Sequence, residues 1–305
     1  MKRVAKTLSL FNLMQSYPGK AEAVAYLERI RWGDSPCCSR CGADDGITRQ
    51  KAKPENYWCK YCRQYFNAWT DTPLEYGKVE LPKWIYAAYL LMTARKGISS
   101  LQLSKELEVT QTTAWYILHR LRIACGSQME ALRGVVEVDE VYLGGKDENR
   151  HESKKLHNQS KSERQTVLGM RERGGNTVAM PIEHADKETL HGAIHKHVRP
   201  GSTICTDENP AYGGVAHRHK TVNHSAKEYV NDMAHTNGIE SVWAVLKRGF
   251  NGVYHNWSKK HCRQYVNEFA FRLNEGNCER DTQDRLDDLF RGMVGKTITY
   301  EELVA

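Results

Sequence analysis

Three segments of the sequence carry carboxylates that could supply oxygen ligands for divalent cations. In GVVEVDEVYLGG (134–145), acids lie among valines that favour a β-strand. In GSTICTDENPAYGG (201–214), an apolar strand ends at Asp207. In AHTNGIESVWAVLKRGF (234–250), Glu240 lies near the start of a helix. Carboxylates from a strand interior, a strand end and a helix start can converge on one cation site.

Such a site would suit phosphodiester chemistry. Mg²⁺ prefers oxygen ligands and retains water, and two such ions can activate an attacking oxygen and stabilise a leaving oxygen. Cations would also offset the cost of placing acids among valines. The simpler alternative is a half-buried strand whose Glu137, Asp139 and Glu140 face water. The alternation of the strand leaves both interpretations open.

Glu240 also has a structural alternative. Asn237 is a plausible N-cap, and a glutamate three residues later would complete a capping box. Against this, Glu240 and Lys247 lie about two turns apart on a helix face beside the apolar stripe. That stripe comprises Ile239, Val242, Trp243, Leu246 and Phe250.

The elements that must position these acids follow from the periodicity. From residue 134 the apolar period approaches two, which predicts strands over 134–143, 165–172, 176–183 and 201–206. Helices are expected near 186–198, 237–250 and 258–275. Strands followed by alternating helices indicate a mixed α/β domain with some parallel pairing. The acidic tail after residue 276 is expected to be peripheral.

Four cysteines have the spacing of a zinc ribbon. Cys38-x2-Cys41 and Cys59-x2-Cys62 can each aim two thiolates at one ion, which predicts a single structural Zn²⁺. Cys37 is adjacent, but its pairing with Cys41 would be the less symmetric C-x3-C. A small ribbon lacks a core, so the metal would supply folding free energy.

Aromatic and basic residues are interleaved around the second cysteine pair. This composition suits nucleic-acid binding, but it equally suits packing within a hairpin. The aromatic residues are Tyr57, Trp58, Tyr61, Tyr65, Phe66 and Trp69, and the basic ones are Lys51, Lys53, Lys60 and Arg63.

Residues 96–122, KGISSLQLSKELEVTQTTAWYILHRLR, have the rhythm of a helix-turn-helix. Glu108-Val109 forms a short turn and Thr110 can cap a second helix, in which Trp115, Leu118 and Leu121 form a buried stripe. We expect Gln111, Thr112 and Thr113 at its exposed start to meet base edges, and Arg120 and Arg122 to contact phosphates. The alternative is an ordinary helical hairpin.

Composition narrows the class of protein. The 305 residues carry a formal net charge of +7, and residues 1–130 hold 19 lysines and arginines against 12 acids, which favours a polyanionic partner. The sequence contains no run of 18 apolar residues, so no membrane span is expected. Nine cysteines, four with metal spacing, favour a reducing, cytoplasmic setting.

The segments VEVDEVYLGGK, TDENPAY and HTNGIESVWAVLKRG, with the N-terminal cysteine pairs, resemble bacterial insertion-sequence transposases of the DDE type. The resemblance covers roughly residues 10–275, and it is to the subgroup with a zinc ribbon before an RNase H-like catalytic domain. It implies the catalytic residues Asp139, Asp207, Glu240 and Lys247, with the three acids holding two Mg²⁺ or Mn²⁺ ions. Glu137 and Glu140 then become neighbours of the site, not ligands.

The resemblance also implies an activity and partners. The chain would bind double-stranded DNA at the inverted repeats of its element, hydrolyse a strand to free a 3′-OH, and join that 3′-OH to target DNA, acting as a homo-oligomer. Two rivals are a domesticated, non-catalytic DNA-binding regulator and an RNase H-like nuclease without strand transfer. The expected organisation is N-terminal helices (1–32), zinc ribbon (33–75), helix-turn-helix (76–130), RNase H-like domain (131–276) and C-terminal tail (277–305).

Overall fold

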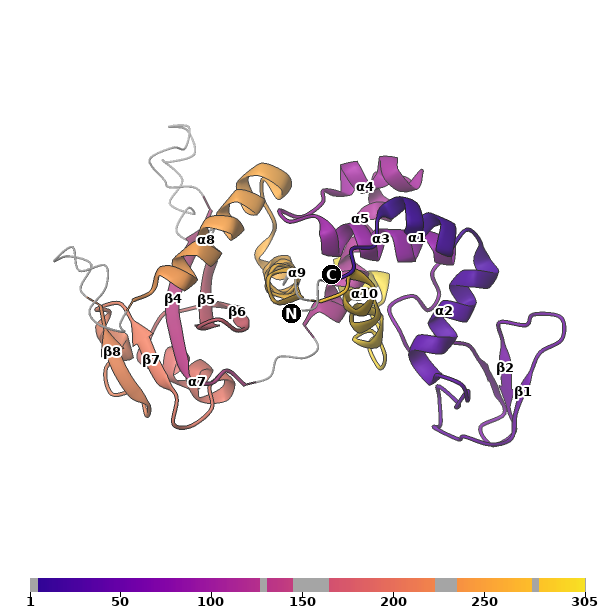
Figure 1. Cartoon of the computed structure of the whole chain (residues 1–305), viewed down its shortest axis with the longest axis horizontal. Helices are drawn as coiled ribbons and strands as arrows, with labels where there is room; N and C mark the ends of the chain where they lie inside the picture. The colour runs from indigo at the N-terminus through magenta and orange to yellow at the C-terminus, as the bar shows by residue number, and fades with distance from the viewer. Residues whose placement is uncertain (1–4, 127–130, 145–164, 223–234, 276–279, 305) are drawn as a thin grey trace. The chain divides into compact units, whose positions relative to one another are not determined.

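The computed structural model describes residues 5–126, 131–144, 165–222, 235–275 and 280–304. The chain divides into two compact units, which are labelled by element in Figure 1. Unit 1 comprises residues 1–127 and 275–305, and unit 2 comprises residues 128–274.

Unit 1 combines helices with a small antiparallel sheet. Its helices are α1 (Leu10–Ser16), α2 (Lys20–Trp32), α3 (Leu81–Thr93), α4 (Ser100–Leu107), α5 (Gln111–Cys125), α10 (Thr282–Arg291) and α11 (Tyr300–Val304). The sheet has the order β1 (Ile47–Arg49), β2 (Tyr57–Cys59) and β3 (Gln64–Phe66). Ser99 and Thr110 each accept a backbone N–H at the start of α4 and α5, which sets where both helices begin.

The C-terminal tail is not peripheral, contrary to the expectation from its acidity. Helix α10 packs against α2, α3 and α5. Leu286, Leu289 and Phe290 are buried, and the Tyr26 hydroxyl donates to Asp287 Oδ1 at 3.0 Å. The apolar stripe of this short helix outweighs its charge, so the tail completes the core of unit 1.

Unit 2 is built on a mixed five-stranded sheet in the order β6-β5-β4-β7-β8. Strands β4 (Val135–Leu143), β5 (Gln165–Glu172) and β6 (Thr177–Ile182) pair antiparallel. Strands β7 (Thr203–Thr206) and β8 (Arg218–Thr221) run parallel to β4. This confirms the predicted mixed α/β fold.

Helices cover both faces of this sheet. Helix α7 (Lys187–His197) packs on the face that carries Val136 and Val138 of β4. On the opposite face, which carries Val141 and Leu143, lie α8 (Asn237–Gly249) and α9 (Cys262–Glu275). Short helical turns η3 (Pro210–Tyr212), η4 (Phe250–Tyr254) and η5 (Lys259–His261) connect these elements. The side chains of β4 therefore alternate between two separate cores.

Strand β8 is absent from the sequence prediction. Its residues, RHKT, are mostly exposed and lack apolar alternation. It lies at the edge of the sheet, where polar side chains are common because they discourage pairing with another chain.

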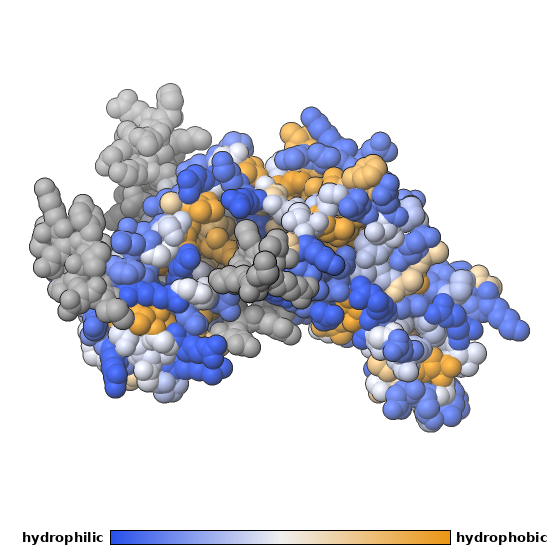
Figure 2. All heavy atoms as spheres, viewed as in Figure 1, coloured by the Kyte–Doolittle hydropathy of each residue, from blue (hydrophilic) through white to orange (hydrophobic). Residues whose placement is uncertain are grey.

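The visible surface of both units is mostly hydrophilic, with hydrophobic residues in small groups (Figure 2). Within the described ranges, the helices are too short or too polar to cross a bilayer.

Candidate active site

The pairing of β4 with β7 brings two of the acids to neighbouring positions. The parallel register pairs Val136 with Ile204 and Glu137 with Cys205. Asp207 follows the end of β7, and its negative charge acts on both Asp139 and Glu140. Neighbouring strands lie about 4.8 Å apart, and in-register residues share a face. Asp139 and Asp207 therefore lie near each other, close to the point where β7 ends.

The Asp139 carboxylate is held by two donors. Trp243 Nε1 on α8 donates to Oδ2 at 3.0 Å, and the backbone N–H of Glu140 donates to Oδ1 at 2.8 Å. Burial raises the pKa of Asp139, and the negative charges of Asp207 and Glu240 raise it further, against the lowering effect of these hydrogen bonds. The three acids thus lie within one electrostatic neighbourhood.

Glycine opposite Asp139 makes room for this arrangement. Gly169 of β5 pairs with Asp139 across the antiparallel ladder. A Cβ at Gly169 would lie 2.4 Å from the six-membered ring of Trp243. The indole therefore packs directly on the backbone of β5, and that is how its N–H reaches Asp139.

Glu240 is exposed on α8, and the alternative in which Asn237 is the N-cap of a capping box is wrong about the position of Asn237. The helix begins at Asn237, and Thr236 occupies the N-cap position without a side-chain cap. Instead, the Thr236 hydroxyl donates to Glu240 Oε1 at 3.1 Å. Lys247 is exposed further along the same helix.

The three acids do not form a closed ligand set in the structure. Within the described residues, four cysteines are the only group of three or more potential ligands whose atoms all lie within 4.8 Å of one another. Like charges repel, and the hydrogen bonds to Trp243 and Thr236 hold Asp139 and Glu240 separately. Joint binding of one cation by Asp139, Asp207 and Glu240 stays a prediction.

The presence of Glu137 among the valines of β4 is explained by its hydrogen-bond partners. It is only 1% exposed and faces the start of α8, where Oε2 accepts the Ile239 N–H at 2.9 Å. Oε1 accepts from Arg173 Nε at 2.9 Å and lies 3.2 Å from His235 Nδ1. A Cβ at Gly238 would lie 2.6 Å from this carboxylate. Glu137 therefore anchors the N-terminus of the helix that carries Glu240.

Glu140 projects to the other face of the sheet. The Tyr212 hydroxyl donates to Oε2 at 2.5 Å, and Asn209 Nδ2 donates to Oε1 at 3.3 Å. Sequence reasoning missed these partners of Glu140, as it missed Gly169 and the role of Glu137. The sequence signal that could have indicated them is the TDENPAY segment, in which Asn209 and Tyr212 closely follow Asp207.

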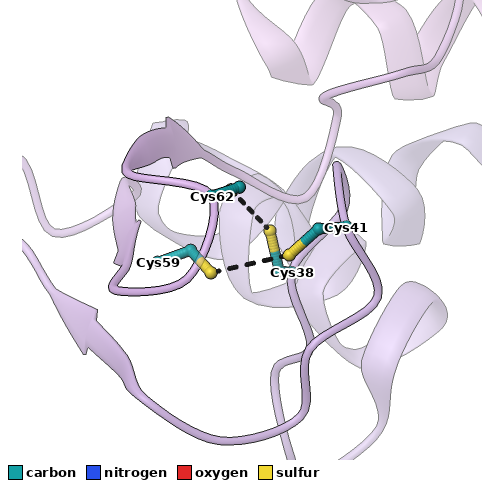
Figure 3. Close-up of side chains that lie close together, drawn as sticks. All are labelled: Cys38, Cys41, Cys59 and Cys62. Carbon is teal, nitrogen blue, oxygen red and sulfur yellow. Dashed lines mark hydrogen bonds between the residues drawn. The ribbon is translucent and has the colours of Figure 1, made fainter.

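The predicted zinc ligands meet in unit 1. Cys38, Cys41, Cys59 and Cys62 point their sulfurs at one another, with Sγ–Sγ distances of 3.7 Å for 38–62 and 41–59 (Figure 3). Zn–S bonds of about 2.3 Å in a tetrahedron require sulfurs about 3.8 Å apart. Cys37 lies outside this group. The cluster fits a zinc ribbon and the choice of Cys38.

The protonation of the thiols also suits a metal. Backbone N–H groups of Cys62 and Tyr61 lower the pKa of the Cys59 thiol to about 7. Burial raises the pKa of Cys62 to about 12. A bound cation would favour the thiolate form of its ligands, so metal binding would be coupled to folding.

The ribbon divides its aromatic residues between packing and exposure. Tyr57 and Phe66 are buried and stack on each other, with Trp32 packed at right angles to both. Tyr61 and Tyr65 are about half exposed. Hairpin packing therefore accounts for part of the set, and the exposed tyrosines keep the DNA interpretation open.

The second helix of the helix-turn-helix begins as expected. Thr110 Oγ1 accepts the Thr113 N–H at 3.2 Å, and Gln111 and Thr112 are exposed. The positions of Arg120 and Arg122, however, do not match the predicted phosphate contacts. Arg120 and Arg122 are 4% and 1% exposed, because the C-terminal half of α5 lies in the core of unit 1.

Arg120 already has partners within unit 1. It donates to the Glu75 carbonyl at 3.1 Å and to the Ile298 carbonyl at 3.5 Å, and its guanidinium stacks on Tyr116. A phosphate role for Arg120 and Arg122 is therefore incorrect for this conformation.

Comparison with known proteins identifies the class of domain in unit 2. Residues 131–274 match the family described as the ISXO2-like transposase domain, so unit 2 contains a transposase domain. The chain is also 28% identical over 274 residues to an uncharacterized protein in transposable element ISH50 of Halobacterium salinarum. That match covers 85% of this chain and 92% of the relative. The family match to residues 131–274 and this similarity support the resemblance to insertion-sequence transposases of the DDE type that the motifs indicated.

Two solved structures show weaker similarity. One is a chain of a simian T-cell lymphotropic virus intasome in complex with the PP2A regulatory subunit B56 gamma, with 15% identity and a TM-score of 0.30. The match covers 62% of this chain and 65% of the intasome chain, just under two thirds of the latter. The other is the Mos1 transposase paired-end complex with left transposon end, with 11% identity, a TM-score of 0.20 and coverage of 64% and 77%. These scores are too low to add to the assignment.

Proposed function

We propose that this transposase binds the terminal inverted repeats of its element, cleaves a strand at each end with divalent-cation dependence, and joins the freed 3′-OH to target DNA. Hydrolysis breaks a phosphodiester bond and releases the 3′-OH. That hydroxyl then attacks a target phosphodiester, and the target's own 3′ oxygen leaves. Because two element ends must be processed, the active form would contain at least two chains.

The single observation that carries this proposal is the parallel register of β4 and β7. It brings the end of β7, which Asp207 follows, next to β4, while α8 packs on β4 through Trp243 and carries Glu240; this arrangement supports a common role for the three acids. Acids of strongly hydrophobic strands are thereby gathered at one place in the fold. The raised pKa of Asp139, caused by burial and then by its acidic neighbours, is the electrostatic mark of this gathering.

The donor set fits hard cations. Asp139, Asp207 and Glu240 offer only oxygen atoms, which suits Mg²⁺ or Mn²⁺. Two such ions, when bound, would polarise the attacked phosphate and stabilise charge on the attacking and leaving oxygens. The N–H groups of Trp243 and Glu140 both donate to Asp139, so they favour its ionised form and fix its orientation.

Other residues would serve DNA binding. The exposed Lys247 lies on the helix that carries Glu240 and is suited to contact a phosphate near the cut. The exposed Gln111 and Thr112, at the start of α5, are suited to base edges in a major groove. The zinc-held ribbon would present Tyr61 and Tyr65 to the same DNA.

The test is an Asp139→Asn variant assayed with labelled DNA carrying an element end. We expect loss of cleavage with unchanged end binding, because the ribbon and helix-turn-helix belong to the other unit. Glu188→Gln removes the same charge from an exposed position on α7 and should leave cleavage intact. Cleavage by Asp139→Asn at the wild-type rate would reject the assignment.

A second assay separates transposition from simple nuclease action. Pre-cut element ends that already carry a 3′-OH are incubated with supercoiled target DNA and Mg²⁺. Joined products support strand transfer by this chain. Cleavage of intact ends without any joining would instead identify a nuclease.

A further inference from the structure

The turn that follows β7 is tied to the far face of β4 through Glu140. Asp207 Oδ1 accepts the Asn209 N–H at 3.1 Å, which shapes the turn directly after the strand. The Asn209 side chain accepts the Ala211 N–H at 3.0 Å and donates to Glu140 at 3.3 Å. Tyr212, at the end of the same turn, donates to the second oxygen of Glu140 at 2.5 Å.

Packing alone does not require these polar contacts. Tyr212 is fully buried among apolar residues of β4 and α7, where phenylalanine would fill nearly the same volume. Glu140 occupies a half-buried position that an aliphatic residue would fill without the cost of partly desolvating a carboxylate. The Glu140 carboxylate accepts hydrogen bonds from two side chains of one turn. These bonds fix the conformation of the turn, although an apolar residue would be easier to bury at this position.

Glu140 also acts on the other acid. Its backbone N–H donates to Asp139 Oδ1, while its side chain holds the turn that begins at Asp207. A single residue thus connects the two neighbouring acids, through its backbone on one side and its side chain on the other.

We propose that Glu140, Asn209 and Tyr212 form a clamp that positions the Asp207 carboxylate beside Asp139 for joint cation binding. The clamp residues are positioning residues and do not themselves bind the cation or the DNA. This inference rests on the proposed function and adds to it the means by which the second acid is held.

The test compares two tyrosines that each donate to a glutamate in unit 2. Tyr212→Phe removes the hydroxyl from the clamp. Tyr254→Phe removes a comparable bond, at 2.7 Å to the buried Glu268, that lies outside the acidic site. Each full-length variant is assayed for Mn²⁺ binding without DNA by calorimetric titration, for the Mn²⁺ concentration that half-saturates end cleavage, and for thermal unfolding.

We expect Tyr212→Phe to weaken Mn²⁺ binding and raise the half-saturating concentration by about tenfold, as for loss of a partner that orients a metal ligand. The cleavage rate at saturating Mn²⁺ should change much less. Tyr254→Phe should lower thermal stability but leave both Mn²⁺ values unchanged. Unchanged Mn²⁺ values in Tyr212→Phe, with normal wild-type cleavage, would overturn the clamp.

Variants of Glu140 add a conservative rescue. Glu140→Gln keeps the shape and a hydrogen-bonding group towards both partners, so its Mn²⁺ affinity should lie between those of the wild type and Glu140→Ala. If Glu140→Gln lost as much Mn²⁺ affinity as Glu140→Ala, Glu140 would be a ligand, and the positioning role would be wrong. A wild-type chain without metal-dependent cleavage would reject the proposed function itself.

Discussion

Replacing Gly169 by alanine would test whether close packing of Trp243 on β5 supports the acidic site. The added Cβ would lie 2.4 Å from Trp243 Cη2 and Cζ2 and 2.9 Å from Ile239 Cδ1. Carbon atoms in contact normally lie about 3.5–4.0 Å apart. The indole must therefore move by about 1 Å, and a shift of that size would break its hydrogen bond to Asp139.

Two effects contribute to the expected loss of stability. Overpacking by one methyl group costs about 1–3 kcal/mol. Loss of a hydrogen bond to a charged group costs about 1.5–3 kcal/mol, but part of this overlaps with the overpacking because both act through Trp243. We expect the free energy of unfolding to fall by about 3 kcal/mol. End cleavage should fall further than stability explains, because Asp139 loses an orienting donor.

Urea unfolding followed by circular dichroism measures the first effect, and cleavage of a labelled element end at a temperature where the variant is folded measures the second. Gly192→Ala is the matched control. Gly192 lies in α7, and its added Cβ would meet nothing within 4 Å, so alanine should stabilise by up to about 1 kcal/mol. If Gly169→Ala were as stable and as active as the wild type, the role assigned to the Trp243 contact would be refuted.

Three other perturbations have expected outcomes. Trp243→Phe removes a bond that lowers the pKa of Asp139, so this already raised pKa should rise further, and the loss of cleavage at acid pH should begin at higher pH in a pH–rate profile. Cys38→Ser should abolish zinc binding and weaken end binding, whereas Cys37→Ser should retain one zinc per chain by atomic absorption. Arg120→Met should lower the melting temperature without reducing the salt dependence of DNA binding in fluorescence anisotropy, since its guanidinium bonds to backbone carbonyls.

The sequence predicted the fold of unit 2 well where apolar periodicity is strong. Strands β4, β5, β6 and β7 and helices α7, α8 and α9 all lie at or near their predicted ranges. The polar edge strand β8 was missed because its side chains face solvent on a sheet edge. The tail was misjudged because its net charge hid the stripe formed by Leu286, Leu289 and Phe290.

Buried arginines show a second limit of sequence reasoning. Arg120 and Arg122 read as surface residues because charge is normally solvated. Helix α5 is instead covered by α3, α4 and α10, and α10 comes from the far end of the chain. Helical periodicity identifies the apolar face of α5, but it cannot show that a distant segment will cover the polar one.

The acids of β4 illustrate why a strand pattern could propose a site but not assign its members. Glu137 and Asp139 share one face, yet Glu137 meets the N-terminus of α8 and Asp139 meets its Trp243, one turn further along. Glu140 meets the other face and the turn after Asp207. Strand parity separates Glu140 from the other two acids, but only the position of α8 along the strand separates Glu137 from Asp139. Because α8 begins about 100 residues later in the chain, that distinction depends on tertiary packing, and the family resemblance supplied what the local pattern lacked.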